Sequence, residues 1–280
     1  MMSFSKILIP IDFSERCLGA ARFAIPLAER FHSEITFLHV EPPPESDAEW
    51  NAEHEARAEK QLRDFLCAAF AHLDVKRILR AGPDVAEEIV RYAREQQPDL
   101  IMMPTHGYGP FRRLLLGSIT AKVLHDTDCP VWTGAHLAQG PPAEWINPTV
   151  VLCAADAAPA SEKPLLWASQ IASALDTALL VVHVEPRLQS PGEEYYSHEY
   201  HRGVLAEAKR KMDQLQGAAS TNARRVFVEA GDVPRAVCAA VKRVEADLLV
   251  IGRGGGEGPG RLGLNAYGII RESPCPVVSV

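Results

Sequence analysis

The residues of this chain that could do chemistry gather in a glycine-containing loop at residues 102–118. The loop contains Gly107, Gly109 and the pair Gly117-Ser118. Glycine lets a backbone approach an oxygen-rich ligand without obstruction from a Cβ atom. Gly117-Ser118 precedes a predicted helix, whose unpaired N–H groups and positive dipole end favour a phosphate. The loop therefore predicts a phosphate site; the alternative is a tight connection that needs glycine only for its turns.

A second chemical group, the carboxylate of Asp12, follows the apolar run at residues 7–11. It could accept hydrogen bonds from a ribose or from an adenine amine. A short apolar run of this kind is typical of a strand that is buried on both faces. Asp12 is therefore expected at the end of a buried strand.

Other signatures of catalysis or metal binding are missing or weak. The chain contains no Gly-x-x-x-x-Gly-Lys-Ser/Thr, Gly-x-Ser-x-Gly or His-Glu-x-x-His motif. Residues 258–263 match Gly-x-Gly-x-x-Gly, but they lie near the last predicted strand rather than in a first βα unit. His198 and His201, with Glu194, share one helix face, and a solvated face explains them better because no Cys or Asp cluster completes a ligand set. Sequence chemistry alone does not indicate an enzyme.

The elements that must position these residues come in two copies. Asp12 recurs as Asp156, residues 39–42 recur as 183–186, and residues 129–131 recur as 275–277. The displacement stays near 144–148 residues throughout, which indicates two copies of one fold. We expect a first domain at residues 1–138, a linker at 139–148 and a second domain at 149–280, each long enough for its own core.

Strands and helices alternate in each copy. In the first copy we predict strands at residues 7–11, 35–40, 76–79, 100–103 and 131–132, and helices at 17–31, 50–73, 85–94 and from 118. This alternation predicts the α/β class with a parallel, doubly wound sheet. Ligands bind such sheets at the carboxyl ends of strands, beside the topological switch point. Asp12 and the loop after Met103 both lie at such ends.

Length and composition narrow the range of partners. The 280 residues are 47% hydrophobic and 23% charged, as in ordinary globular proteins. A net charge of −7 gives no bulk attraction for nucleic acid or anionic lipid, although a nucleotide could still bind. No apolar run approaches the ~20 residues that span a bilayer, the N-terminus has no secretory pattern, and the six cysteines form no Cys-x-x-Cys. We expect a cytoplasmic protein that binds neither nucleic acid nor membrane.

Together, these residues resemble the universal stress proteins. The resemblance is carried by Lys-Ile-Leu-Ile-Pro-Ile-Asp at residues 6–12, His-Val-Glu-Pro at 39–42, the run at 114–124 and Asp-Cys-Pro-Val at 128–131, and it covers both halves. It implies a tandem member with two flavodoxin-like domains, each a five-stranded doubly wound parallel sheet, that acts in the cytoplasm in response to stress. One branch of the family binds ATP through Gly-x-x-Gly-x9-Gly-Ser/Thr, and another branch lacks the motif and does not.

In the first copy this motif falls on residues 104–107 and on Gly117-Ser118, with Pro104 in place of the first glycine. The resemblance implies ATP or AMP in this domain, with Mg²⁺ as an optional companion. The residues that it places at the nucleotide are Asp12 and Val40 at the adenosine, His106, Gly107, Gly117 and Ser118 at the phosphates, Thr120 at a terminal phosphate or a metal, and Met103.

In the second copy the motif falls on residues 252–255 and then on Asn265-Ala266, followed by a helix that we expect to be two residues shorter. The Gly-Ser pair that would hold phosphate is therefore lost. The degenerate second site that the resemblance implies consists of Asp156, Val184, Gly252 and Gly255.

Two functional hypotheses remain open. In the first, the chain is a nucleotide-binding stress regulator; in the second, it is a nucleotide-free interaction module whose second domain is a degenerate partner of the first. Slow ATP hydrolysis or self-phosphorylation ranks last, because no general base is visible. We expect the two domains to pair through the strands at Val131 and Val277, as the family's dimers do, and leave a homodimer and an unidentified protein partner open.

Overall fold

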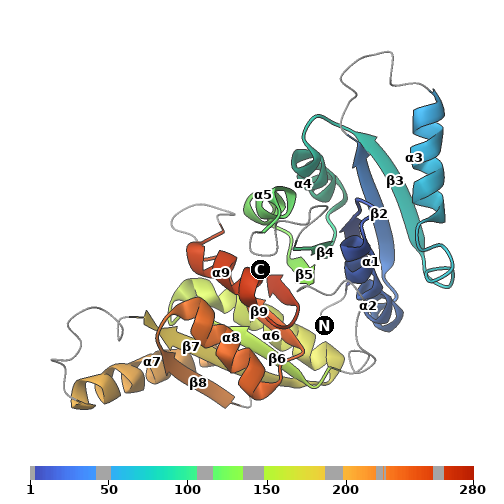
Figure 1. The fold of residues 1–280 in the computed structure, drawn as a ribbon. Helices are drawn as coiled ribbons and strands as arrows, with labels where there is room; N and C mark the ends of the chain where they lie inside the picture. The colour runs from blue at the N-terminus through green and yellow to red at the C-terminus, as the bar shows by residue number, and fades with distance from the viewer. Residues whose placement is uncertain are drawn as a thin grey trace. The chain divides into compact units, whose positions relative to one another are not determined.

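The computed structural model describes residues 4–41, 52–105, 116–134, 148–186, 198–218, 223, 225–254 and 262–280. They belong to two compact units, Ser3–Pro142 (unit 1) and Ala143–Val280 (unit 2) (Figure 1). Residues 139–147 of the predicted linker lie outside the described part of the chain. The domain bounds expected above stay a prediction.

Unit 1 alternates strands with helices, as expected. Its strands are β1 (Lys6–Pro10), β2 (Glu34–Glu41), β3 (Val75–Ala81), β4 (Leu100–Pro104) and β5 (Val131–Gly134). Its helices are α1 (Glu15–Arg22), α2 (Ala24–Phe31), α3 (Ala52–Asp64), α4 (Val85–Gln96) and α5 (Ser118–Asp126). The strands pair in parallel in the order β3-β2-β1-β4-β5. The predicted doubly wound parallel sheet is confirmed for this unit.

The order of the strands places the helices of unit 1 on two faces. The chain moves from β1 to β2 to β3 through α1, α2 and α3, and it moves in the opposite direction through α4 and α5. Right-handed crossovers therefore put α1–α3 on one face and α4 and α5 on the other. In agreement, α4 contacts α5 and α1 contacts α2. The switch point of the sheet lies between β1 and β4.

Two helices of unit 1 differ from the sequence-based expectation. The predicted helix at residues 17–31 is divided at Phe23 into α1 and α2. Pro26 has no N–H to donate to the carbonyl group of Arg22, which interrupts the helical ladder. The predicted helix at residues 50–73 ends at Asp64. Leu66 has a φ of 49°, a left-handed conformation that a regular helix cannot contain.

Unit 2 repeats the architecture. Its strands are β6 (Val150–Ala154), β7 (Ala178–Glu185), β8 (Arg225–Ala230), β9 (Leu248–Ile251) and β10 (Val277–Ser279). Its helices are α6 (Glu162–Leu175), preceded by a 3₁₀ turn at Pro159–Ser161, α7 (His198–Ala218), α8 (Val233–Val244) and α9 (Leu264–Glu272). The strands pair in parallel in the order β8-β7-β6-β9-β10. By the same argument, α6 and α7 share one face, and α8 and α9 share the other.

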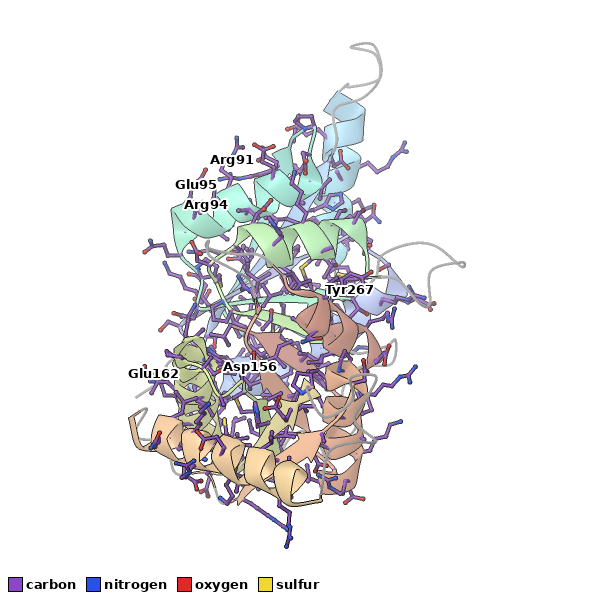
Figure 2. All side chains as sticks on the ribbon, turned by 90° about the vertical axis from the view of Figure 1, so that its left-hand side faces the viewer. Arg91, Arg94, Glu95, Asp156, Glu162 and Tyr267 are labelled. Carbon is purple, nitrogen blue, oxygen red and sulfur yellow. The ribbon has the colours of Figure 1, made fainter. Side chains whose placement is uncertain are left out.

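The core of each unit is the central strand and the helix stripes that cover it. In β1, Ile7, Leu8 and Ile9 are at most 1% exposed, as expected for a strand buried on both faces. Charged residues such as Arg91 and Glu95 of α4 remain exposed at the surface (Figure 2). Within the described residues, no helix combines the length and the hydrophobicity that crossing a bilayer requires.

Candidate functional site

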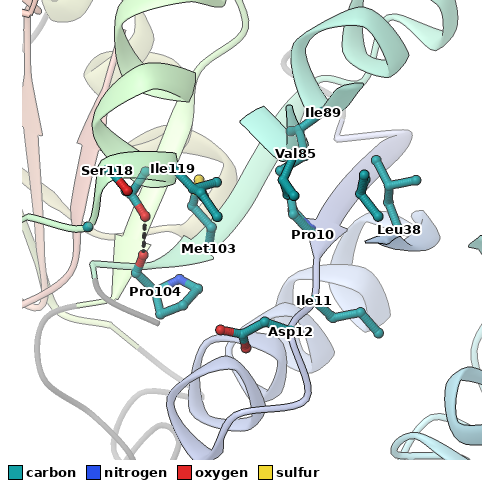
Figure 3. Close-up of a pocket in the computed structure, with 13 residues that line it drawn as sticks. Pro10, Ile11, Asp12, Leu38, Val85, Ile89, Met103, Pro104, Ser118 and Ile119 are labelled. Atoms are coloured by element: carbon teal, nitrogen blue, oxygen red, sulfur yellow. Dashed lines mark hydrogen bonds between the residues drawn. The ribbon is translucent and has the colours of Figure 1, made fainter. Parts of the chain in front are cut away.

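A cavity of about 320 Å³ opens at the switch point of unit 1 (Figure 3). Strand ends form its floor, α4 forms one wall, and the first turn of α5 closes one end. Its described lining consists of Pro10, Ile11, Asp12, Leu38, Val40, Val85, Ile89, Met103, Pro104, Gly117, Ser118, Ile119 and Thr120. Most of these side chains are apolar, which suits a flat organic ring.

The polar group of the cavity is the Asp12 carboxylate. Its Oδ1 accepts a hydrogen bond of 3.0 Å from the backbone N–H of Ser14, which holds the loop after β1 in a tight turn. In Figure 3 this carboxylate lies on the Pro104 side of the cavity, away from Val85 and Ile89. Among the described lining residues it is the one charged side chain. The cavity thus has an apolar slot and a single anionic acceptor.

A buried thiol, that of Cys17, packs against the end of β1, next to the loop that carries Asp12. Cys17 is fully buried, and its Sγ lies 3.6 Å from the carbonyl oxygen of Pro10, to which the thiol donates. Burial raises the pKa of the Cys17 thiol to about 12. This thiol therefore stays protonated and contributes packing rather than nucleophilic chemistry.

The N-terminus of α5 forms one end of the cavity. Gly117 is the N-cap residue, with φ −60° and ψ 142°, and it makes no side-chain cap. Its own N–H donates to the carbonyl oxygen of Thr105 at 2.8 Å, which fixes the entry of the chain into the helix. The next N–H groups, from Ser118 onward, have no acceptor within the helix. Together with the helix dipole, they make this end attractive to an anion.

Pro104 forms part of the wall without closing the cavity. It ends β4, where its missing N–H is tolerated, and its carbonyl oxygen accepts a 3.0 Å hydrogen bond from Thr120 Oγ1 (Figure 3). Thr120 is 4% exposed. Its hydroxyl is thus committed to the backbone rather than directed at a ligand.

Six of the eight residues predicted for the first site line this one cavity. They are Asp12, Val40, Met103, Gly117, Ser118 and Thr120. His106 and Gly107 lie outside the described residues. That any of them contacts a nucleotide stays a prediction.

The lining residues missed from the sequence are mainly apolar. They are Pro10, Ile11, Leu38, Val85, Ile89 and Ile119. Val85 and Ile89 are four positions apart on the helix that begins after Asp84, so their shared face was visible in the sequence. Only the handedness of the crossover shows that this face covers the switch point.

The corresponding region of unit 2 corrects our alignment of the second motif. The N-cap of α9 is Gly263, and its N–H donates to the Arg253 carbonyl oxygen at 2.7 Å, as Gly117 does to Thr105. Gly263-Leu264, not Asn265-Ala266, therefore corresponds to Gly117-Ser118. The expected shortening of the helix is wrong, because α5 and α9 both contain 9 residues. The two missing residues fall in the preceding loop.

Two of the four residues of the predicted second site line one cavity, and the site itself stays a prediction. Asp156 and Val184 line a separate cavity beside α7. Gly252 is not among the residues that line this cavity. A Cβ atom at Gly252 would contact the Pro164 ring of α6 at 3.5 Å. Gly255 lies outside the described residues. Leu264 replaces the serine of the first motif and is 92% exposed.

Metal binding finds no support in the geometry of the described residues. In that part of the chain, no group of three or more His, Cys, Asp or Glu side chains is arranged to hold a metal ion. The described residues offer a shaped cavity, one carboxylate and a helix N-terminus, and this arrangement can bind and orient a small anion-bearing ligand.

Comparison with known proteins gives the family. The model of the universal stress protein family matches residues 3–133 and again 149–280. Universal stress protein MJ0531 of Methanocaldococcus jannaschii is 31% identical over 139 residues, which are 46% of this chain and 80% of that protein. A universal stress protein of Thermus aquaticus is 31% identical over 134 residues, 46% of this chain and 96% of that one.

A solved structure shows the same fold over the whole length. The universal stress protein from Archaeoglobus fulgidus DSM 4304 aligns with a TM-score of 0.71, covering 99% of this chain and 96% of its own, at 22% identity. The double match of the family model supports the tandem arrangement of two flavodoxin-like domains. The chain belongs to the universal stress protein family, a family of stress-response proteins.

Proposed function

We propose that unit 1 binds an adenine nucleotide, ATP or AMP, in the cavity between β1 and β4. The observation that carries this proposal is that one cavity of about 320 Å³ combines an apolar slot, a carboxylate and a helix N-terminus. These three features match the base, the ribose and the phosphate of a nucleotide. The volume lies at the lower end of the range, ~300–1,000 Å³, that small-molecule sites occupy.

The apolar slot suits a purine. Leu38, Val40 and Met103 come from the strands, and Val85 and Ile89 come from α4. Burying a flat ring between them contributes on the order of 25 cal/mol for each Å² of apolar surface removed from water. Asp12, at the opposite side of the slot, is the acceptor for the ribose hydroxyls or for the adenine amine.

The phosphates in this proposal meet backbone rather than basic side chains. No Lys or Arg is among the described lining residues, so the anion is held by N–H groups of the α5 N-terminus and by the Ser118 hydroxyl. His106 and Gly107 stay predicted phosphate contacts. Thr120 would reach a phosphate only by leaving Pro104, and Mg²⁺ would enter with the phosphates that it neutralises.

Nucleotide occupancy then serves regulation. We assign this chain to the cytoplasm, as a regulator whose contacts depend on bound nucleotide, rather than to metabolic catalysis. Pairing of the two units within the chain, a homodimer and an unidentified protein partner stay predictions. A second function, a nucleotide-free interaction module, is favoured by one observation: Pro104, which has no N–H, stands where the family motif has glycine, and its carbonyl oxygen accepts the Thr120 hydroxyl.

Nucleotide analysis of the freshly purified chain tests the proposal. Native mass spectrometry and denaturing extraction should find up to one adenine nucleotide per chain, and titration with ATP, ADP and AMP should give saturable binding. Gly117→Val should abolish it, because the added side chain occupies the phosphate end while the β-region φ and ψ of this residue tolerate valine. Asp12→Asn should weaken it, and the matched Asp156→Asn in unit 2 should not. No binding at millimolar ATP would move the chain to the interaction-module class.

A further inference from the structure

Unit 2 contains a cavity of about 560 Å³ that the proposed nucleotide site does not include. It lies on the α7 side of β7, between the loop after β6 and the first half of α7. Asp156, labelled in Figure 2, comes from this loop, and His183 and Glu185 come from β7. The nucleotide cavity of unit 1 lies beside α4 and α5, which correspond to α8 and α9 of unit 2. The two cavities therefore belong to opposite faces of their sheets.

One lining residue of this cavity is much smaller than its counterpart in unit 1. In unit 1 the corresponding position holds Phe13, whose ring centroid lies 4.5 Å from that of His39 and 5.6 Å from that of Phe65. The residue displaced by the same 144 positions in unit 2 is Ala157. Ala157 lines the cavity with a methyl group in place of an aromatic ring.

The cavity is also lined by a buried histidine with a ring nitrogen that has no hydrogen-bond partner. His183 is 6% exposed, and its Nδ1 lies 3.0 Å from the carbonyl oxygen of Ala155, so Nδ1 carries the proton and donates. Nε2 is buried and has no hydrogen-bond partner. The equivalent His39 differs, because its Nε2 lies 3.5 Å from Glu41 Oε1. Nε2 of a neutral His183 is thus a buried acceptor that lacks a donor, a costly arrangement.

The charges around the cavity restrict what could supply that donor. Asp156, Glu185 and Glu207 contribute three carboxylates, and Lys211 contributes one ammonium group, 3.6 Å from Glu207. Glu207 also pairs with Arg210, and among the described residues at this cavity negative charge still exceeds positive charge, so an organic cation is favoured over an anion. The other lining side chains are small or apolar: Ala157, Ala158, Val184, Pro186, Val204 and Ala208.

We propose that this cavity binds a small aromatic amine. Its ring lies beside Ala157 and His183, an N–H or O–H group donates to Nε2, and its cationic amine faces the Asp156 carboxylate. A metal ion is not the occupant, because these carboxylates and His183 are not grouped to hold one within the described residues. This site is independent of nucleotide binding in unit 1.

Tyramine tests the proposal, because it joins a phenol to a protonated amine. Calorimetric titration of the full chain should give one saturable site in the millimolar range or tighter. The matched anion 4-hydroxyphenylacetate has the same ring and should bind at least about tenfold more weakly. Equal binding of the two, or no tyramine binding at all, would overturn the proposal.

Variants locate the site. Ala157→Phe installs the side chain of unit 1 and should abolish tyramine binding, and His183→Gln should weaken it by about tenfold or more. His39→Gln is the control and should leave binding unchanged, because Phe13 covers that ring. If Ala157→Phe does not fold, Val204→Phe narrows the same cavity from α7. If a folded Ala157→Phe or Val204→Phe variant still binds tyramine, the proposed site is wrong.

Discussion

Unit 1 and unit 2 have the same strand order and differ at the carboxyl ends of their strands. In unit 1 the described cavity lies on the α4–α5 side of β1, and Phe13 fills the other side. In unit 2 the cavity lies on the α7 side of β7, where Ala157 replaces the aromatic ring. The order of the strands is the same in both sheets. Two copies of one α/β unit can therefore have their cavities on opposite faces of the sheet.

The loop before the last helix of each unit, α5 or α9, also differs between the two units. In both units the N–H of the helix N-cap glycine donates to the carbonyl oxygen of the residue directly after Pro104 or Gly252, which is Thr105 or Arg253. The intervening loop is two residues shorter in unit 2. Its ends are correspondingly crowded, since a Cβ atom at Gly263 would overlap the Gly254 carbonyl group. The hydrogen bond that anchors the N-cap glycine is preserved, although the loop before it is shorter in unit 2.

The largest effect is expected from Gly263→Ala. The added methyl group must displace backbone rather than a flexible side chain, so we expect unit 2 to lose about 3 kcal/mol of its free energy of unfolding. Urea denaturation followed by circular dichroism measures this. The control Gly217→Ala, in open space on α7, should instead stabilise by up to ~1 kcal/mol through helix propensity. An unchanged midpoint for Gly263→Ala would mean that the loop is not crowded.

A smaller loss is expected from Phe13→Ala, which gives unit 1 the side chain of unit 2. The ring packs on His39 and Phe65, and it is only half-buried, so we expect a cost of about 2 kcal/mol, below the usual range for a fully buried ring. The positive φ of 61° at position 13 is as unfavourable for alanine as for phenylalanine, so it does not add to the difference in stability. Urea denaturation provides the measurement, and nucleotide binding on the opposite face should persist. A variant as stable as the parent would show that the ring contributes nothing to unit 1.

The helices that follow the third strand of each unit, α4 and α8, should differ in how their contribution to stability depends on pH. Asp84 and Asp232 both cap their helices, accepting from the N–H groups of Glu87 and Arg235. Asp84 also pairs with Lys122, at the position of Gly268, whereas Asp232 has a long contact of 4.0 Å with the Arg235 side chain of its own helix. The hydrogen bond to Lys122 lowers the pKa of Asp84 below 3.8, and the same bond raises the pKa of Lys122 above 10.5.

The sign of the effect follows from these directions. The Asp84 contribution is present above pH 3.8 and is lost as the pH falls through its lowered pKa; that of Lys122 is present below pH 10.5 and is lost as the pH rises through its raised pKa. Asp84→Asn should thus lower the urea midpoint at pH 7 more than Asp232→Asn does, since asparagine keeps both caps. The difference should shrink in high salt and in acid. Equal urea midpoints of the two variants at low salt would show that the Asp84–Lys122 ion pair does not stabilise unit 1.

The smallest effect concerns thiol reactivity and leaves stability unchanged. Cys67 of unit 1 is exposed, whereas Cys153, Cys238 and Cys275 of unit 2 are buried. Burial raises the pKa of Cys238 to about 11 and that of Cys275 to about 12. Alkylation of the native chain near pH 8, read by peptide mass spectrometry, should therefore modify Cys67 first. Rapid modification of Cys153 would indicate that unit 2 opens locally.

Much of this protein could be predicted from the sequence because the relevant signals are local or repeated. The apolar run at residues 7–11 indicates a buried strand, and Asp84 and Asp232 cap helices through their own neighbours. The displacement of about 144 residues indicates two copies of one fold, and alternation of strands and helices then dictates a parallel sheet with ligands at its switch point. Asp12, Gly117 and Ser118 followed from this rule.

The tertiary structure decided what depends on groups far apart in the chain. Only packing shows that Val85 and Ile89 of α4 complete the cavity, that Thr120 is tied to Pro104, and that Gly263 rather than Asn265 begins the second motif's helix. The cavity beside His183 is the clearest case. Phe13 and Ala157 differ by one ring, but whether that ring leaves a hole depends on which helix lies over the strand, and this is set by the fold as a whole.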